Sequence, residues 1–299
     1  MERIILCWLV GLNLWLWGMV GLRGLHSRWL EVTILDVGHG DSIVIRTPNR
    51  QTLLVDTGTH EAGQYVVAPF LRFNGVQRLD AVVLTHPDED HLGGAIPLVQ
   101  QGYVRRLLTN GFTVKTPTAH QVLDLANAAS LRSDRLAAGM QLTGLGGMEM
   151  MVLHPPPQFV PGTASSSNDN SLVIKVTKGA VSVLLCGDLE ERGVPWLMRW
   201  GPQLRATILK VPHHGSALGQ WQRRLFEQVH PELSVISVGR LHHLPAAGVL
   251  RDLESVNSRV YLTRDYGAVT VRTDGKQLLV KTYRQSIVHS EKQSIVDSP

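Results

Sequence analysis

Six consecutive residues hold the side chains best suited to chemistry in this chain: His86-Pro87-Asp88-Glu89-Asp90-His91. They follow the apolar run Ala81–Leu84, which predicts a buried strand, and precede Gly93-Gly94, which predicts a turn into a helix. Imidazole nitrogens and carboxylate oxygens at a strand end can converge on one or two divalent cations. The spacing therefore predicts a metal site rather than a capped helix start with solvated acids.

Other polar residues lie at the ends of other predicted strands. These are Asp56 after Leu53–Val55, Asn168-Asp169-Asn170-Ser171 before Leu172–Val176, Gly187-Asp188 after Val181–Leu185, and Pro212-His213-His214-Gly215-Ser216 after Ile208–Val211. Active sites are usually built on loops that a rigid sheet holds in place. We therefore expect these side chains to gather around His86–His91. His39 and His154 have no partner at ligand spacing, and we expect them at the surface and at a strand end.

The elements that must position these residues are short and closely spaced. Apolar runs predict strands at residues 32–37, 41–47, 51–56, 81–85, 103–109, 148–153, 172–176, 181–185, 206–211, 233–238 and 260–262, and helices at 62–74, 220–229 and 247–256. Hairpins at the front, followed by interleaved helices and strands, predict an α/β sandwich of two sheets covered by helices. The chain shows no internal repeat and no linker that would separate domains.

The first 30 residues differ from the rest. Residues 4–22 are almost wholly apolar, interrupted by Asn13 and three glycines, and 19 helical residues would cross a bilayer. We expect an uncleaved membrane helix here. A signal peptide is the alternative, but no small-x-small cleavage site follows Gly21. Residues 286–299 are polar and predict a poorly ordered tail.

The overall charge and the cysteines narrow the possibilities only slightly. The net charge of +4 and the pI of about 9.2 permit polyanionic partners without indicating nucleic acid on their own. Two distant cysteines, Cys7 and Cys186, cannot build a disulfide framework or a cysteine zinc cluster.

Taken together, the ordered motifs resemble the metallo-β-lactamase-fold C-terminal domain of ComEC-type DNA-uptake competence proteins. The motifs that carry the resemblance are residues 36–42, 54–58, 86–94, 168–173, 185–188 and 210–216. It covers about residues 31–285. The fold that it implies is a metallo-β-lactamase-type αββα sandwich of two mixed sheets flanked by helices, here preceded by one hydrophobic N-terminal helix.

The resemblance also implies roles for individual residues around two divalent metal ions. His86 and Asp88 would hold one ion, Asp90 and His91 the other, with Asp188 bridging and His214 as the late histidine ligand. His213 is the alternative to His214. Asp56 would support the first metal loop, Asn168 or Asp169 would complete the first site, and Asp41 and Ser42 would shape the rim. Asp90 would take part in catalysis, and His213 or Ser216 would assist the leaving oxygen.

The implied activity is metal-dependent hydrolysis, with DNA as the substrate. A pair of cations about 3.5–4 Å apart can activate one water. Asp88 stands where many relatives have histidine, so the site favours Mn²⁺, with Zn²⁺ possible. The implied partners are single-stranded DNA, the membrane, and a separate DNA-channel subunit, at the outer face of the bacterial cytoplasmic membrane. Two alternatives are a hydrolase of small esters, lactones or thioesters, and a non-catalytic DNA-binding module.

Overall fold

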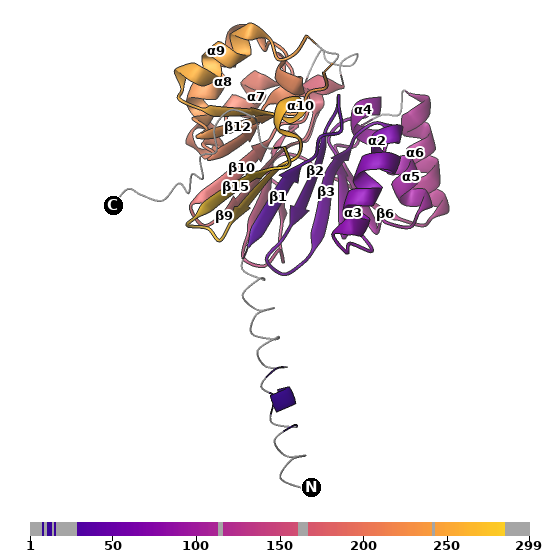
Figure 1. Ribbon diagram of the computed structural model, residues 1–299. Coiled ribbons are helices and arrows are strands. Elements are labelled where there is room, and N and C mark those ends of the chain that lie inside the picture. Colours follow the sequence, from indigo (N-terminus) through magenta and orange to yellow (C-terminus); the bar gives the residue numbers. More distant parts are fainter. Residues whose placement is uncertain are drawn as a thin grey trace.

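Two β-sheets lie face to face, and helices cover the outer face of each sheet (Figure 1). The computed structural model describes residues 29–112, 116–160, 167–240 and 243–284, together with residues 8, 11–13 and 15. The predicted α/β sandwich of two helix-covered sheets is confirmed.

The first sheet has eight strands in the order β15-β14-β1-β2-β3-β4-β5-β6. Its strands are β1 (Leu30–Ile34), β2 (Ser42–Arg46), β3 (Thr52–Thr57), β4 (Ala81–Leu84), β5 (Arg106–Thr109), β6 (Arg132–Arg135), β14 (Val269–Thr273) and β15 (Leu278–Thr282). Strands β3 to β6 are parallel, whereas the pairs from β15 to β3 are antiparallel. The sheet is therefore mixed.

The second sheet has seven strands in the order β13-β12-β11-β10-β9-β8-β7. Its strands are β7 (Gln141–Leu142), β8 (Glu149–His154), β9 (Val173–Lys178), β10 (Val181–Leu185), β11 (Ile208–Lys210), β12 (Leu233–Ile236) and β13 (Arg259–Leu262). Strands β10 to β13 are parallel, and the hairpin predicted across residues 177–180 joins β9 to β10. This sheet is also mixed.

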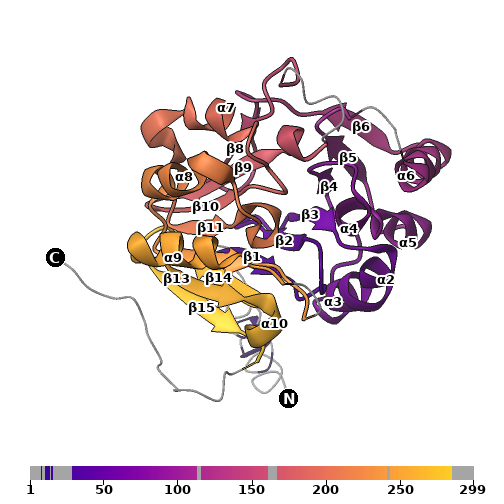
Figure 2. The same cartoon turned by 90° about the horizontal axis from the view of Figure 1, so that it is seen from above.

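The helices divide between the two outer faces (Figures 1 and 2). The first sheet carries α2 (His60–Ala62), a π-helical turn η1 (Gly63–Val67), α3 (Ala68–Phe73), α4 (Glu89–Leu92), α5 (Ala95–Gln100) and α6 (Pro117–Ala128). The second carries α7 (Val194–Met198), α8 (Gln222–Val229) and α9 (Ala247–Ser255), and α10 (Thr263–Tyr266) follows β13. The 3₁₀ turns are η2 (Asn168–Asn170), η3 (Gly201–Leu204), η4 (Pro212–Gly215) and η5 (Gly219–Trp221).

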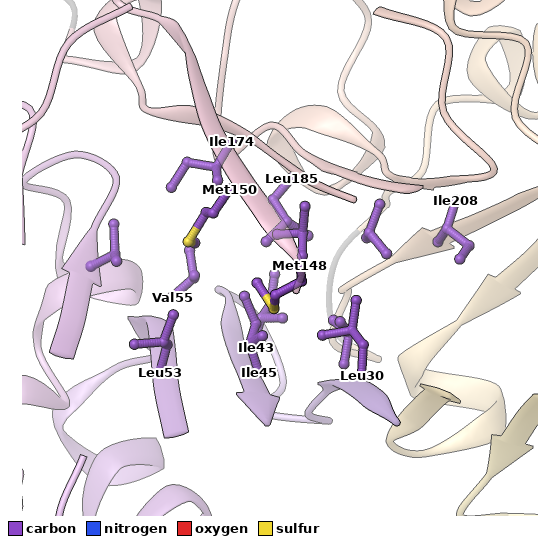
Figure 3. Packing of buried hydrophobic residues seen from close by; sticks show 14 of the residues in the cluster. Leu30, Ile43, Ile45, Leu53, Val55, Met148, Met150, Ile174, Leu185 and Ile208 are labelled. Carbon is purple, nitrogen blue, oxygen red and sulfur yellow. The ribbon is translucent and has the colours of Figure 1, made fainter. Parts of the chain in front are cut away.

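Three apolar layers hold the sandwich together. The middle layer lies between the sheets, where Ile43 and Val55 of the first sheet face Met150 and Ile174 of the second (Figure 3). The outer layers join each sheet to its helices. Strands buried on both faces read as continuous apolar runs, and all four residues of β4 are buried. Burial of this much apolar surface stabilises the spacing of the two sheets.

One hairpin was not among the predicted elements. β14 pairs with β1, and β15 extends the sheet beyond it. The sequence does carry the signal, because Asp274-Gly275 lies between alternating apolar residues. Asp274 accepts hydrogen bonds from the backbone of Lys276 and Gln277, which closes the turn.

Two sequence predictions lie largely or wholly outside the described residues. They are the hydrophobic segment 1–30 and the polar tail 286–299. Within the described parts of the chain, no helix combines the length and the apolar character that crossing a bilayer requires.

Candidate metal centre

The carboxyl ends of parallel strands from both sheets meet at one end of the sandwich. Asp56 lies near the end of β3, His86 follows β4, and His91 lies in α4 just beyond. From the other sheet, Asp188 follows β10 and His214 follows β11. Residues far apart in the sequence therefore reach one place, because the two sheets present the same ends side by side.

Four side chains from this set could hold one cation. Each of Asp90, His91, Asp188 and His214 offers one ligand atom, and these atoms all lie within 4.8 Å of one another. Asp188 is central, with Oδ1 3.2 Å from His91 Nε2 and Oδ2 3.3 Å from His214 Nε2. Asp90 Oδ2 lies 3.3 Å from His214 Nε2. Two sheets thus contribute equally to the cluster.

Hydrogen bonds set which nitrogen of each imidazole faces the cluster. His91 Nδ1 donates to Asp56 Oδ2 at 2.8 Å, and His214 Nδ1 donates to the Ser237 carbonyl at 2.9 Å, since carboxylate and carbonyl oxygens can only accept. Partners of this kind orient imidazole ligands in metal proteins. Both rings therefore direct Nε2 toward Asp188.

His86 is oriented through Thr85. The Thr85 hydroxyl donates to Asp56 Oδ2 at 2.7 Å, so the 2.9 Å contact with His86 Nδ1 requires the imidazole to donate. This leaves a lone pair on His86 Nε2, which is fully buried without a hydrogen-bond partner among the described residues. An orphaned buried nitrogen calls for an explanation, and a cation supplies one.

The imidazoles and carboxylates shift one another's pKa in opposite directions. Burial by itself lowers the pKa of His91, but Asp188 and Asp56 outweigh it and hold that pKa well above the usual value. Burial also lowers the pKa of His214, but Asp188, Asp90 and Asp41 outweigh it and raise that pKa to about 9. Burial raises the pKa of Asp188, yet His91 and His214 hold it well below its usual range. The carboxylates therefore make the cluster negative enough for these imidazoles to hold protons at the place where a cation would bind.

His86 behaves differently because burial and His91 outweigh the effect of its acidic neighbours. Burial and the nearby charge of His91 lower its pKa. Its Nε2 lies 3.7 Å from Asp88 Oδ2, and its ring centroid lies 4.2 Å from that of His91. A neutral, buried imidazole beside a carboxylate can ligate a second cation without first losing a proton.

A hydrogen-bonded rim surrounds this second position. Ser167 Oγ donates to Asp88 Oδ1 at 2.8 Å, and Glu190 Oε1 accepts from Asn168 Nδ2 at 3.1 Å. His213 Nδ1 lies 3.1 Å from the same Glu190 oxygen, while its Nε2 lies 3.7 Å from Asp188 Oδ2. Glu190 thus connects Asn168 to His213. Sequence reasoning missed it, although it lies two residues after Asp188.

The structure separates the two adjacent histidines. His213 and His214 both have positive φ angles, 45° and 53°, so the chain turns sharply within η4. His214 is fully buried in the four-residue cluster, whereas the His213 side chain is 26% exposed and faces the rim. Positive φ is uncommon outside glycine, and such conformations concentrate at functional sites.

The other predicted residues fall in different places. Asp169 Oδ1 accepts from the backbone N–H groups of Arg192 and Gly193, which positions that loop and leaves Asp169 outside the cluster. Ser216 is half-buried, and its backbone N–H donates to the His213 carbonyl.

His39 was expected at the surface without a partner; its side chain is 31% exposed, but the expectation of no partner is wrong. Its ring centroid lies 4.4 Å from that of His214, and its Nε2 lies 3.6 Å from Asp90 Oδ2. The loop between β1 and β2 brings it there. Gly40 allows this approach, because a Cβ on Gly40 would fall 2.1 Å from the Asp90 carbonyl oxygen.

The donors fit divalent cations. His86, His91 and His214 each present Nε2 toward the same region, and Asp88, Asp90 and Asp188 supply carboxylate oxygens. Mixed imidazole and carboxylate sets suit Zn²⁺, Mn²⁺ and iron. The fold and this donor set define an α/β sandwich protein with a candidate site for divalent metal ions.

Comparisons with known proteins identify the family. The profile of the metallo-beta-lactamase superfamily matches residues 35–239, and the chain therefore belongs to that superfamily. It is 33% identical over 261 residues to ComE operon protein 3 of Bacillus subtilis, covering 81% of this chain and 33% of that protein. It is 30% identical over 273 residues to competence protein ComA of Neisseria gonorrhoeae, covering 88% of this chain and 35% of that protein. The resemblance to competence proteins is confirmed, and the chain spans about a third of the length of these relatives.

Solved structures share the fold at low identity. The metallo-beta-lactamase fold protein YhfI from Bacillus subtilis superimposes with a TM-score of 0.55 at 15% identity, covering 82% of this chain and 100% of that one. CmlA, a diiron beta-hydroxylase from Streptomyces venezuelae, gives a TM-score of 0.51 at 14% identity, covering 81% of this chain and 54% of that one. These likenesses show the fold alone.

Proposed function

We propose that this protein is a binuclear metal-dependent nuclease that hydrolyses phosphodiester bonds of single-stranded DNA during DNA uptake. The observation that carries the hydrolase assignment is the orientation of His86, His91 and His214 around Asp188. Each imidazole uses Nδ1 to bond a neighbouring residue and leaves Nε2 for a cation. His86 and Asp88 would hold one ion, and Asp90, His91 and His214 the other, with Asp188 between them.

The chemistry divides between the ions and the protein. Two divalent cations held there would supply Lewis-acid chemistry that activates water and neutralises charge on a phosphoryl group. Asp56 and Thr85 hold the rings of His91 and His86 in place. Glu190 bonds His213 at Nδ1 and raises its pKa against the effect of burial, so His213 can carry a proton to a leaving oxygen.

The DNA substrate rests on the relatives rather than on the site. The curated relatives above include a competence protein, ComA, and each match covers more than four-fifths of this chain. A place at the outer face of the bacterial cytoplasmic membrane, a membrane helix within residues 1–30 and a separate DNA-channel subunit belong to the same proposal.

A small-ester, lactone or thioester hydrolase is the second candidate. The same fold supports a diiron beta-hydroxylase, so the fold does not determine the reaction. A non-catalytic DNA-binding module is the third. The three differ in which substrate is turned over and in whether Asp90 is needed.

The decisive experiment is a cleavage assay on the full chain. We expect labelled single-stranded DNA to be cleaved with Mn²⁺, faster than with Zn²⁺, because carboxylate ligands favour the harder ion. Asp90→Ala should lower turnover by at least about 100-fold. Removing a residue that only orients a metal ligand usually has a smaller effect. In EDTA, the thermal unfolding of Asp90→Ala should match that of Asp124→Ala, which replaces an exposed carboxylate on α6 and should stay active.

The outcomes separate the candidates. Cleavage of generic esters or lactones without cleavage of DNA selects the second candidate. DNA binding that survives Asp90→Ala, with no turnover in either protein, selects the third. Better rescue by Zn²⁺ than by Mn²⁺ removes the metal preference alone.

A further inference from the structure

A fully buried ion pair lies directly behind the candidate metal centre. Lys210 Nζ is 2.8 Å from Asp41 Oδ2, with 0% of the lysine and 1% of the aspartate side chain exposed. Lys210 Nζ also donates to the Val211 carbonyl at 3.0 Å. Because neither side chain reaches solvent, the pair cannot contact a substrate.

The pair joins the two sheets. Asp41 lies immediately before β2 in the first sheet, whereas Lys210 is the last residue of β11 in the second. Each partner is also connected to a candidate ligand from its own half of the sandwich, either by a hydrogen bond or along the chain. The Asp41 backbone N–H donates to the Asp90 carbonyl at 3.3 Å, and Lys210 lies four residues before His214. Asp41 Oδ1 lies 3.7 Å from His214 Nδ1.

Asp41 has a further tie to the first sheet. Its carbonyl accepts from Gly58 N–H at 2.8 Å, two residues after Asp56, which bonds His91. The ion pair therefore connects the loops that carry Asp90 and His91 to the loop that carries His214. Cluster atoms on these loops must stay within a few tenths of an ångström of a productive spacing.

Stability alone does not account for such a pair. Removing two charges from water is costly, and replacing a buried ion pair by apolar residues of similar volume is often neutral or stabilising. Removing one partner is strongly destabilising, because it leaves an unpaired buried charge. An apolar pair would pack here without directional contacts, so it would not specify the distance between the two loops.

We propose that Asp41 and Lys210 are positioning residues that set the spacing between Asp90 and His214 across the two sheets, and so determine how tightly the centre binds a divalent cation. This inference rests on the proposed metal site. It assigns Lys210 a role in forming the metal centre, and this role depends on neither the substrate nor catalysis.

The test compares cation affinity with stability. In the full chain, Asp41→Leu/Lys210→Met removes both charges and keeps similar volumes. We expect an unchanged or higher Tm without metal, but a Kd for Mn²⁺ raised about 10- to 100-fold, as for other residues that orient ligands. Titration calorimetry with MnCl₂ measures the Kd, and thermal unfolding in EDTA measures the Tm.

A matched control removes a buried polar contact within one sheet. The hydroxyls of Ser234 in β12 and of Ser258, immediately before β13, lie 2.8 Å apart and are buried. Ser234→Ala/Ser258→Ala should bind Mn²⁺ with the wild-type Kd. The single variants Asp41→Leu and Lys210→Met should each have a lower Tm than the double variant.

Each outcome decides the inference. A double variant with the wild-type Kd overturns it whatever its Tm, because the pair would then not set the spacing that governs cation binding. If the double variant does not fold, the decision passes to Asp41→Asn, which keeps the shape and one acceptor oxygen: a weaker Kd supports the inference and an unchanged Kd overturns it. If wild-type protein binds no Mn²⁺ or other divalent ion, the proposed function fails first, and this result is distinct from the others.

Discussion

His154 shows how burial acts on a single imidazole away from the metal centre. Its side chain is fully buried, its Nδ1 donates to the Ser171 carbonyl at 2.9 Å, and its Nε2 has no hydrogen-bond partner among the described residues. Burial outweighs the hydrogen bond to Ser171 and lowers its pKa to about 4. A protonated ring would be an unpaired charge in an apolar layer.

The lowered pKa predicts acid sensitivity. The unfolded chain binds a proton at His154 below about pH 6.5, whereas the folded chain does so only near pH 4, so stability is complete above 6.5 and falls as the pH drops toward 4. Between pH 7 and pH 5 this one group should remove about 2 kcal/mol from the free energy of unfolding. Urea unfolding at both pH values, in EDTA, measures the change.

His154→Asn is the matched variant for this prediction. Its amide nitrogen can still donate to Ser171, but it cannot titrate. The variant should lose about 2 kcal/mol less than wild type between the two pH values, since all other titrating groups are shared. Equal losses in the two proteins would show that another group controls the acid response.

Only some of the residues in the candidate metal centre could be predicted from the sequence. The types and order of His86, Asp90, His91 and Asp188 predicted that they would meet, and the structure brings them together. The sequence could not rank His213 against His214, because adjacent residues in a loop differ only through backbone angles. Glu190 and Lys210 were missed because each acts through a contact between distant segments.

At the scale of elements, close backbone packing positions the metal loop. Gly94 lies between α4 and α5, and a Cβ there would fall 2.1 Å from the Thr57 carbonyl oxygen. A Cβ on Gly63, the first residue of η1, would fall 2.3 Å from Gly94 Cα. These two glycines let α4, which carries Asp90 and His91, approach the end of β3.

Gly94→Ala should therefore be destabilising even though its backbone suits any residue, with φ −67°. Overpacking of this kind costs about 1–3 kcal/mol, and backbone atoms cannot move aside as a side chain can. We expect a loss of free energy of unfolding near the upper end of that range in urea unfolding, together with weaker Mn²⁺ binding.

The control is Gly248→Ala on α9, where the atom nearest to the added Cβ is 3.6 Å away. Here we expect the free energy of unfolding to rise by up to about 1 kcal/mol. Similar effects at the two positions would contradict the packing argument.

Strands and helices were predictable where their apolar residues form a regular pattern. The apolar runs predicted β10 with the observed bounds and most other strands to within a few residues. β6 was missed because all its residues are polar; it is held by pairing with β5 and by the Arg106–Asp134 ion pair. The helix predicted over 62–74 is interrupted by the π-helical turn η1, a distortion that depends on packing rather than on local preference.

At the scale of the whole molecule, the candidate centre lies across the seam between the sheets. His86, Asp90 and His91 lie just beyond β4 of the first sheet, and Asp188 and His214 lie beyond β10 and β11 of the second. The sequence predicted two sheets covered by helices. It could not predict how the sheets register against each other, because side chains such as Ile43 and Met150 determine that spacing only when packed (Figure 3).

Because both sheets supply ligands, a bound cation should cross-link them. Ligand that binds only the folded chain stabilises it by RT ln(1 + [L]/Kd), about 2.7 kcal/mol at 100 times Kd, so Mn²⁺ should raise the Tm of EDTA-stripped protein. His214→Ala removes the second sheet's only imidazole in the four-residue cluster, and most of that Mn²⁺-dependent rise should disappear. His120→Ala, which replaces an exposed histidine on α6, should keep the full rise.

The measured quantity is the difference in Tm with and without Mn²⁺ for each protein. This difference cancels any effect of the substitution on the metal-free fold. An undiminished rise in His214→Ala would mean that His214 does not hold the cation, which would contradict its proposed role as a ligand.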